Sequence, residues 1–145
     1  MIARPDTVAI IALTPEREIL LVRQWRQPVR MYTLELPAGI VDPGESVEDA
    51  ACRELLEETG YRATSMVRVA TLVTSPGFTD ERGYLLLASN CEYDASGMVD
   101  ETTDVVRMVR PSIVRMVDSP LGEPLDGKTF AGLNWWLRTS ESAFS

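Results

Sequence analysis

Acidic side chains are concentrated between Asp42 and Glu58, where seven carboxylates share a short segment with one arginine, Arg53. The segment reads GIVDPGESVEDAACRELLEETGY, residues 39–61, and it has a glycine at or near each end. Carboxylates at this density are suited to acid–base chemistry or to the binding of hard cations such as Mg²⁺ or Mn²⁺. Any acid–base or metal chemistry of this chain is therefore expected to depend on carboxylates.

The acidic segment is expected to form a helix from about Ser46 to Glu58, with its N-cap at Ser46 or the residue before and Gly60 as its stop. At about 100° per residue, Glu54, Glu57 and Glu58 fall on one face. The last two lie at the C-terminal end, where the helix dipole disfavours negative charge. The alternative is a solvent-exposed acidic helix face without a ligand. However, acids at the negative end of the helix dipole indicate that an external positive charge stabilises them. A divalent cation is the obvious source.

The composition narrows the chemistry further. The 145-residue chain carries a net charge of −8 and has no histidine, which excludes Ser-His-Asp and Cys-His nucleophile arrangements and the usual zinc sites. The negative charge disfavours binding to nucleic acid or to an anionic membrane. No apolar run is long enough to cross a membrane, and the N-terminus lacks the layout of a secretion signal. We expect one domain over residues 1–145, in a reduced, cytoplasmic protein.

The hydrophobic pattern predicts strands in hairpin order around one long helix. Such an arrangement is typical of an α/β (α+β) domain in which a mixed β-sheet is sandwiched between helices. Neither repeats nor linker-like stretches divide the chain. The expected strands are 8–13, 19–24, 34–38, 67–73, 84–88 and 105–109, and the further helices are about 112–117 and 128–137.

The spacing G-x5-E-x7-R-E-L-x-E-E-x-G-Y, from Gly39 to Tyr61, resembles a complete Nudix box. That box is the signature of enzymes that hydrolyse nucleoside diphosphates linked to another moiety. The resemblance implies a Nudix fold with a loop–helix–loop catalytic motif and Mg²⁺ or Mn²⁺ as cofactor. The metal ligands that it implies are Glu54, Glu58, the carbonyl oxygen of Ala38 and, directly or through water, Glu57.

The resemblance also gives roles to the other positions of the box. Arg53 is expected to be buried against Glu45 or Glu57 and to hold the acids in place. Gly39 would let the chain approach the metal site, and Gly60 would cap the helix. Divalent ions held there would bind phosphate oxygens and lower the pKa of a bound water, from which a carboxylate could take the proton.

Segments outside the box resemble the ADP-ribose pyrophosphatase branch of the family. They are VRQWR (22–26), LELPAG (34–39), SPGFTDE (75–81) and DGKTFAGL (126–133). Pro76 follows Gly60 by sixteen residues, the distance that marks this branch. The resemblance implies a homodimer that cuts ADP-ribose or a related nucleotide sugar into AMP and a sugar phosphate. The alternatives are a dinucleoside polyphosphate or nucleoside triphosphate hydrolase and a non-catalytic nucleotide-sensing module.

Candidate substrate residues follow from the same resemblance. Arg23 and Arg26 are candidates for the phosphates or ribose, because guanidinium groups suit phosphate oxygens. Glu35 and Glu81 are candidates for contacts to ribose or to metal-bound water. The remaining candidates are Pro76, Gly77 and Phe78 as a pocket wall, and Trp25 or Phe78 as a stacking surface for adenine, with packing in the core as the alternative for both aromatics.

The general base of this branch comes from an acidic loop late in the chain, and VDETTD (99–104) is the candidate segment. Glu101 is the first choice, Asp100 and Asp104 are second, and an ordinary acidic turn is the alternative.

Members of the branch also carry several tens of residues ahead of the strand at 8–13. This sequence begins almost at that strand, so we expect a nucleoside pocket built in another way and a dimer without the usual swapped segment.

Overall fold

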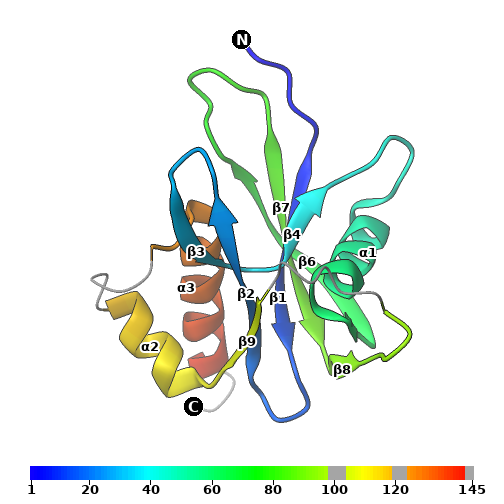
Figure 1. Cartoon of the computed structure of the whole chain (residues 1–145), viewed down its shortest axis with the longest axis vertical. Coiled ribbons are helices and arrows are strands. Elements are labelled where there is room, and N and C mark those ends of the chain that lie inside the picture. Colours follow the sequence, from blue (N-terminus) through cyan, green and yellow to red (C-terminus); the bar gives the residue numbers. More distant parts are fainter. Residues whose placement is uncertain (98–103, 119–123, 143–145) are drawn as a thin grey trace.

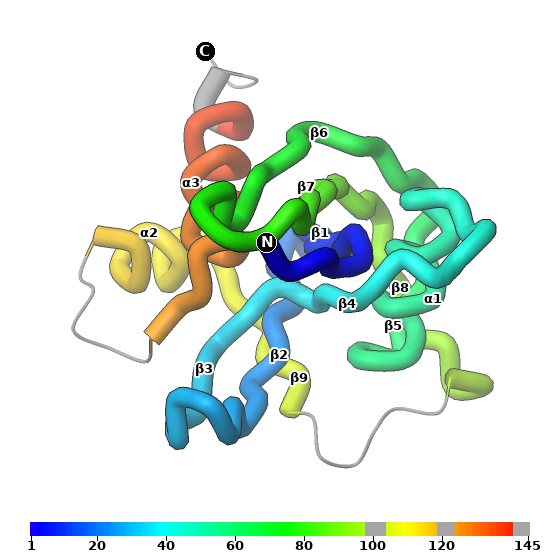
Figure 2. The backbone as a smooth tube through the Cα atoms, turned by 90° about the horizontal axis from the view of Figure 1, so that it is seen from above, coloured from blue at the N-terminus to red at the C-terminus, as the bar shows by residue number. Residues whose placement is uncertain are grey.

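A computed structural model describes residues 1–97, 104–118 and 124–142 of the chain. A twisted sheet stands between helices, with α1 on one side and α2 and α3 on the other (Figure 1). The view from above separates the same layers (Figure 2). The helices are α1 Val47–Thr59, α2 Arg110–Asp118 and α3 Gly127–Ser142; the strands are β1 Thr7–Leu13, β2 Ile19–Arg26, β3 Met31–Glu35, β4 Ala38–Ile40, β5 Tyr61–Arg62, β6 Ser65–Val73, β7 Arg82–Ser89, β8 Glu92–Tyr93 and β9 Asp104–Met108.

The main sheet has the strand order β3-β2-β1-β7-β6, while β4 pairs with β1 and β9 with β2. β1 and β7 run parallel from the pair Thr7–Gly83 to the pair Ala12–Ala88. The other strand pairs named here are antiparallel, so the sheet is mixed. The mixed sheet between helices confirms the predicted fold class. The hairpin order predicted from the sequence does not include the parallel pairing of β1 with β7.

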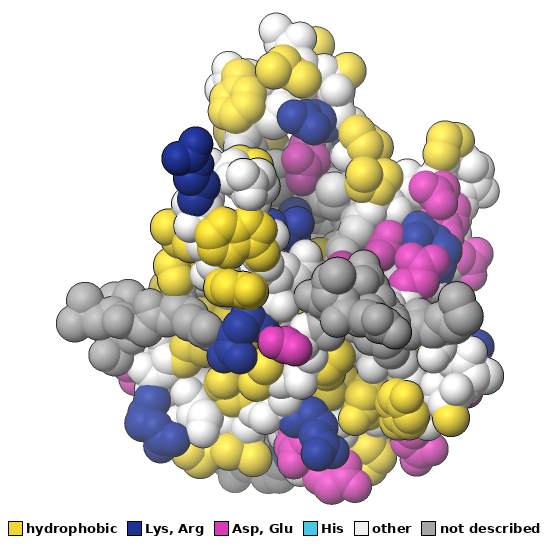
Figure 3. Space-filling view, in the orientation of Figure 1, with side chains coloured by type: hydrophobic (Ala, Val, Ile, Leu, Met, Phe, Trp, Pro, Cys, Tyr) yellow, Lys and Arg dark blue, Asp and Glu magenta, His cyan; other side chains and the backbone are white. Residues whose placement is uncertain are grey.

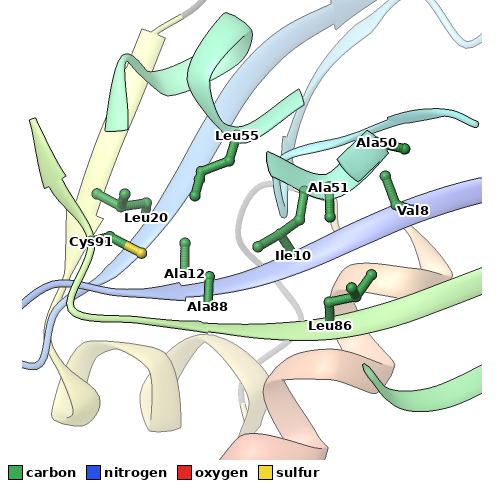
Figure 4. Close-up of a cluster of buried hydrophobic side chains, with 10 residues drawn as sticks. All are labelled: Val8, Ile10, Ala12, Leu20, Ala50, Ala51, Leu55, Leu86, Ala88 and Cys91. Carbon is green, nitrogen blue, oxygen red and sulfur yellow. The ribbon is translucent and has the colours of Figure 1, made fainter. Parts of the chain in front are cut away.

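Two hydrophobic clusters fill the space on the two faces of the sheet, and β1 contributes to both. Val8, Ile10 and Ala12 pack with α1 and belong to the cluster drawn in Figure 4. Ala9 and Ile11 alternate with them and join the cluster under α3. Because successive side chains of a strand point to opposite faces, the continuous apolar run VAIIAL is what a strand buried on both faces requires.

The predicted strand 34–38 is divided in two in the structure. β3 ends at Glu35 and β4 begins at Ala38, because Pro37 has no N–H to donate and the chain crosses there from β2 to β1. The N–H of Leu36 is satisfied instead by the hydroxyl of Thr129, at 2.8 Å. This crossing brings β4 next to the acidic helix.

The helix α1 has the ends that the sequence predicts. Ser46 is its N-cap and accepts a hydrogen bond from the N–H of Asp49, at 3.0 Å. Gly60 ends it with a left-handed φ of 76°, a conformation that glycine adopts without strain. Ala50, Ala51 and Leu55 are fully buried against the sheet, so the acidic face points outward.

Helix α3 approaches the sheet most closely at Gly132. A Cβ at this position would lie 2.7 Å from Cδ1 of Leu36 and 3.1 Å from Cδ1 of Leu85. We therefore expect Gly132→Leu to lower the free energy of unfolding, measured with urea, by about 1–3 kcal/mol, as overpacking of a core does. Gly127→Leu is the control, because nothing lies within 4 Å of that position. Equal stability of the two variants would contradict this packing.

Among the described residues, no helix is both long enough and apolar enough to span a bilayer.

Candidate active site

Acidic side chains of α1 and of the preceding loop meet around the guanidinium group of Arg53. Figure 3 shows Asp and Glu side chains gathered around a basic one at the right, over α1. Arg53 donates to both oxygens of Glu45 at 2.9 Å, to Glu54 at 2.8 Å and to the carbonyl oxygen of Ile40 at 2.9 Å. Glu57 lies farther from it, at 3.4 Å. The guanidinium group of Arg53 thus links the loop before α1, the end of β4 and the acidic face of α1.

The pairing of Arg53 with Glu45 agrees with the prediction, but the predicted burial is wrong. The side chain of Arg53 is 30% exposed, although its partners Glu45 and Glu54 are only 17% and 13% exposed. The pKa of Arg53 is raised, first by its hydrogen bond with Glu45. The same hydrogen bond lowers the pKa of Glu45 to about 2, so Glu45 stays ionised at neutral pH.

Glu58 lies one turn away and points toward β4 and β2. Its Oε2 accepts the N–H of Ala38 at 3.0 Å, and its Oε1 lies 3.4 Å from the side-chain nitrogen of Gln24. The pKa of Glu58 is raised to about 7, chiefly by burial and also by the charge of Glu54, while the hydrogen bond from the Ala38 N–H acts in the opposite direction. Gln24 was not predicted as a site residue, although its alternation with Arg26 along β2 places both on one face.

Glu54 is packed directly against the backbone of β4. A Cβ on Gly39 would lie 2.0 Å from Cδ of Glu54 and 2.1 Å from its Oε1, so only glycine leaves room for this carboxylate. Burial raises the pKa of Glu54, while its hydrogen bond with Arg53 lowers it. The absence of a side chain at Gly39 thus lets β4 approach Glu54, one of the metal ligands that the box implies.

The donor set of this cluster fits a hard divalent cation. Glu54 and Glu58 are partly buried carboxylates whose pKa values are raised by burial and by neighbouring acids, Glu57 and Asp42 for Glu54 and Glu54 for Glu58, which is the electrostatic condition that a bound cation would relieve. Within the described part of the chain, however, no three acidic, cysteine or histidine side chains already converge as a metal site. Arg53 and the Ala38 N–H hold the carboxylates apart, so the side chains would have to turn to share an ion.

Arg26 and Glu35 form a two-pronged ion pair on the sheet face that carries Gln24. Nε of Arg26 donates to Oε2 of Glu35 at 2.7 Å, and Nη2 donates to Oε1 at 2.9 Å. Thr33 donates a third hydrogen bond to Glu35 at 2.9 Å. The hydrogen bond with Glu35 is the main cause that raises the pKa of Arg26, and the charges of Glu58 and Asp126 also raise it. The oxygens of Glu35, expected at ribose or metal-bound water, are therefore already engaged within the protein.

Arg23 and Arg26 lie three residues apart on β2, so they point to opposite faces of the strand. The structure thus does not bring the two predicted arginines together. Trp25 and Tyr32 pair across β2 and β3, with ring centroids 5.3 Å apart in an edge-on arrangement. Both rings are about half exposed, which excludes core packing for Trp25.

The segment SPGFTDE forms the turn between β6 and β7. The turn closes through the N–H of Phe78, which donates to the carbonyl of Ser75 at 3.2 Å, and the ring of Phe78 is 62% exposed. Pro76 is also exposed. Glu81 accepts from the hydroxyl of Thr7 at 3.1 Å and lies 3.8 Å from Nζ of Lys128. A hollow of about 460 Å³ beside this turn is lined by Leu72, Val73, Thr74, Ser75, Glu81, Asp126, Gly127, Lys128 and Ala131, and not by the acids of α1.

The predicted general base, Glu101, lies outside the described residues, as does Asp100. Asp104 is the first residue of β9, is exposed and pairs in register with Arg23. No role of these three residues is tested by the geometry.

Comparisons with known proteins agree with this fold. The NUDIX domain model matches residues 3–126. The chain is 36% identical over 132 residues to an ADP-ribose pyrophosphatase of Bacillus subtilis, covering 89% of this chain and 70% of that protein. It is 38% identical over 111 residues to a methanol dehydrogenase activator of Bacillus methanolicus, covering 74% of this chain and 60% of that protein.

A solved crystal structure of an ADP compounds hydrolase has the same fold. It superposes with a TM-score of 0.79 and 22% sequence identity over 94% of this chain and 76% of the other. The family model covers most of the chain, and the acid cluster around Arg53 occupies the helix on which the box lies. The chain belongs to the Nudix family.

Proposed function

We propose that the protein is a metal-dependent hydrolase of nucleoside diphosphate derivatives, with ADP-ribose or a related nucleotide sugar cut into AMP and a sugar phosphate. The observation that carries the proposal is the acid cluster of α1 and the loop before it, in which Arg53 binds Glu45 and Glu54 while Glu58 lies against Ala38. The similarity to an ADP-ribose pyrophosphatase over 89% of the chain supports the substrate class.

In this proposal Glu54, Glu57, Glu58 and the Ala38 carbonyl hold Mg²⁺ or Mn²⁺. The bound ion would neutralise phosphate charge and provide an ionised water at neutral pH. Arg53 keeps Glu45 ionised and orients Glu54, so the acidic face stays assembled while the substrate is absent. Glu101 is proposed as the group that accepts a proton from the attacking water, a step typically worth ~10²–10⁴-fold.

Arg26 is proposed to bind the diphosphate, because it is half exposed and shares the face of β2 on which Gln24 reaches Glu58. Trp25, on the opposite face, offers an exposed ring for a nucleobase. Arg23, Glu81, Pro76 and Phe78 remain proposed substrate contacts.

The deciding experiment is a substrate panel with purified protein and Mg²⁺ or Mn²⁺. The panel contains ADP-ribose, other nucleotide sugars, dinucleoside polyphosphates and nucleoside triphosphates, and the products are identified by chromatography. We expect AMP and a sugar phosphate. Turnover of triphosphates alone would overturn the ADP-ribose assignment, and turnover of none would favour a nucleotide-sensing module.

We also propose that the protein is a homodimer in the cytoplasm with a small-molecule partner and no affinity for nucleic acid. The net charge of −8 supports the last point, since polyanions are repelled by an acidic surface. Light scattering after gel filtration measures the oligomeric state, and a monomer at micromolar concentration would contradict the dimer.

A further inference from the structure

Glu35 is a buried carboxylate whose bonding is complete within the protein. Its side chain is 8% exposed, and its oxygens accept two hydrogen bonds from Arg26 and one from Thr33. Its partner Arg26 is much more exposed to solvent, with 46% of its side chain accessible. One end of the ion pair is thus fixed in the sheet, and the other end reaches the surface.

Stability does not explain this pair. Removing a carboxylate from water costs several kcal/mol, and replacing a buried ion pair by apolar side chains is often neutral or stabilising. Glu35 also pairs in register with Val22 of β2, an apolar residue that is fully buried, so the position does not itself demand a charge. The buried carboxylate of Glu35 therefore indicates a role in fixing the position of the Arg26 guanidinium group.

The direction of the ion pair shows what that geometry achieves. Glu35 binds the Nε and Nη2 edge of the guanidinium group, and among the described residues no hydrogen bond to Nη1 of Arg26 is present. Gln24 lies two residues before Arg26 on the same strand face, and its side chain lies beside Glu58. The unbound edge of Arg26 is thus presented on the face of the sheet that meets the acid cluster of α1.

We propose that Glu35 is a positioning residue that aims the free edge of Arg26 at a phosphate oxygen of the substrate held at the α1 acids. This inference rests on the function proposed above. Glu35 itself contacts neither substrate nor metal. Arg26 is flexible and half exposed, so without a fixed partner its guanidinium group would sample many rotamers and lose affinity for a phosphate.

The expected result for Glu35→Gln is a KM for ADP-ribose raised by about tenfold, with kcat changed by less than about threefold. The phosphate charge is present in the bound substrate and in the transition state alike. Loss of the contact between Arg26 and the phosphate therefore weakens substrate binding more than it slows the chemical step. The Mg²⁺ concentration for half-maximal activity stays unchanged. A shift in that concentration would overturn the proposal, because it would place Glu35 at the metal.

Arg26→Lys keeps the charge but lacks the two-pronged donor edge, and we expect it to raise KM as Glu35→Gln does. Because Arg26 is half exposed, this variant tests the proposal even if Glu35→Gln folds poorly. In the Arg26→Ala background, Glu35→Gln is expected to have no further effect on KM. A full additional loss in the double variant would show that Glu35 acts without Arg26 and would overturn the proposal.

Glu18→Gln is the matched control, since it removes another glutamate–arginine pair, with Arg107 at 3.6 Å, from the beginning of β2. Its KM should equal that of the unsubstituted protein. Binding of the non-hydrolysable α,β-methylene analogue of ADP-ribose, measured by calorimetry, separates this inference from the proposed function. Absent turnover with intact analogue binding would overturn only the hydrolase, while equal analogue affinity of Glu35→Gln and the unsubstituted protein would overturn only the positioning role.

Discussion

Glu58→Gln is expected to reduce hydrolysis by about 10²–10³-fold, the effect of removing one preorganised group that stabilises the transition state. The same substitution should raise the melting temperature of the metal-free protein at pH 7.5 by about 2–4 °C, which roughly 1 kcal/mol produces in a domain of this size. The reason is that the site holds a carboxylate that burial disfavours in its charged form. A glutamine can still accept the N–H of Ala38.

The pKa of Glu58 also fixes the sign of a pH effect. Its folded-state pKa is about 7, above the ordinary value of 4.5, so the folded state binds the proton more tightly than the unfolded state. The resulting stability is complete below pH 4.5 and is lost as the pH rises through 7. The stability of metal-free protein should therefore fall between pH 5 and pH 8, and Glu58→Gln should remove much of that slope.

Glu48→Gln is the control for both measurements. Glu48 lies on the same helix but pairs with Arg68 at 3.2 Å, away from the Arg53 cluster, so activity should be unchanged. Activities are compared at saturating Mg²⁺, and melting temperatures in the presence of a chelator. A Glu58→Gln protein that keeps a third of the activity, or that melts earlier than the unsubstituted protein, would contradict the metal-binding role.

The sequence predicts the acid cluster well because its geometry is local. Capping by Ser46 and Gly60 and the spacing of the glutamates along one helix determine which carboxylates share a face. The fold class follows in the same way from apolar periodicity in β1 and in α1. The pairings of β1 with β7 and of β2 with β9 join distant segments, and no local signal gives the parallel direction of the first.

Contacts between elements are the part that the sequence does not predict. Arg23 and Arg26 lie in one short motif, yet their separation of three residues sends them to opposite faces of β2. The partner of Arg26 is Glu35 on the next strand, and this depends on the register of β2 with β3. Gln24 meets Glu58 only because α1 packs over that end of β2.

Gly39→Ala is expected to lower activity by about 10²-fold, as large a loss as removing one charged group of the site. The added Cβ would lie 2.0–2.4 Å from three atoms of the Glu54 carboxyl group, so that group must move away from β4 and from Arg53. The atoms displaced are the far end of a flexible side chain. Stability should therefore change by less than about 1 kcal/mol, since alanine in a strand interior is otherwise favoured over glycine.

The contact of Gly39 with Glu54 can be isolated by a double substitution. In a Glu54→Ala background the added methyl group meets no carboxylate, so Gly39→Ala should cause no further loss of activity. Gly127→Ala, at an open position, is the control for the substitution itself and should retain full activity. Calorimetric titration with Mn²⁺ should show weaker binding in Gly39→Ala than in this control. Unchanged Mn²⁺ affinity, or a further loss of activity in the double variant, would show that Gly39 does not act by making room for Glu54.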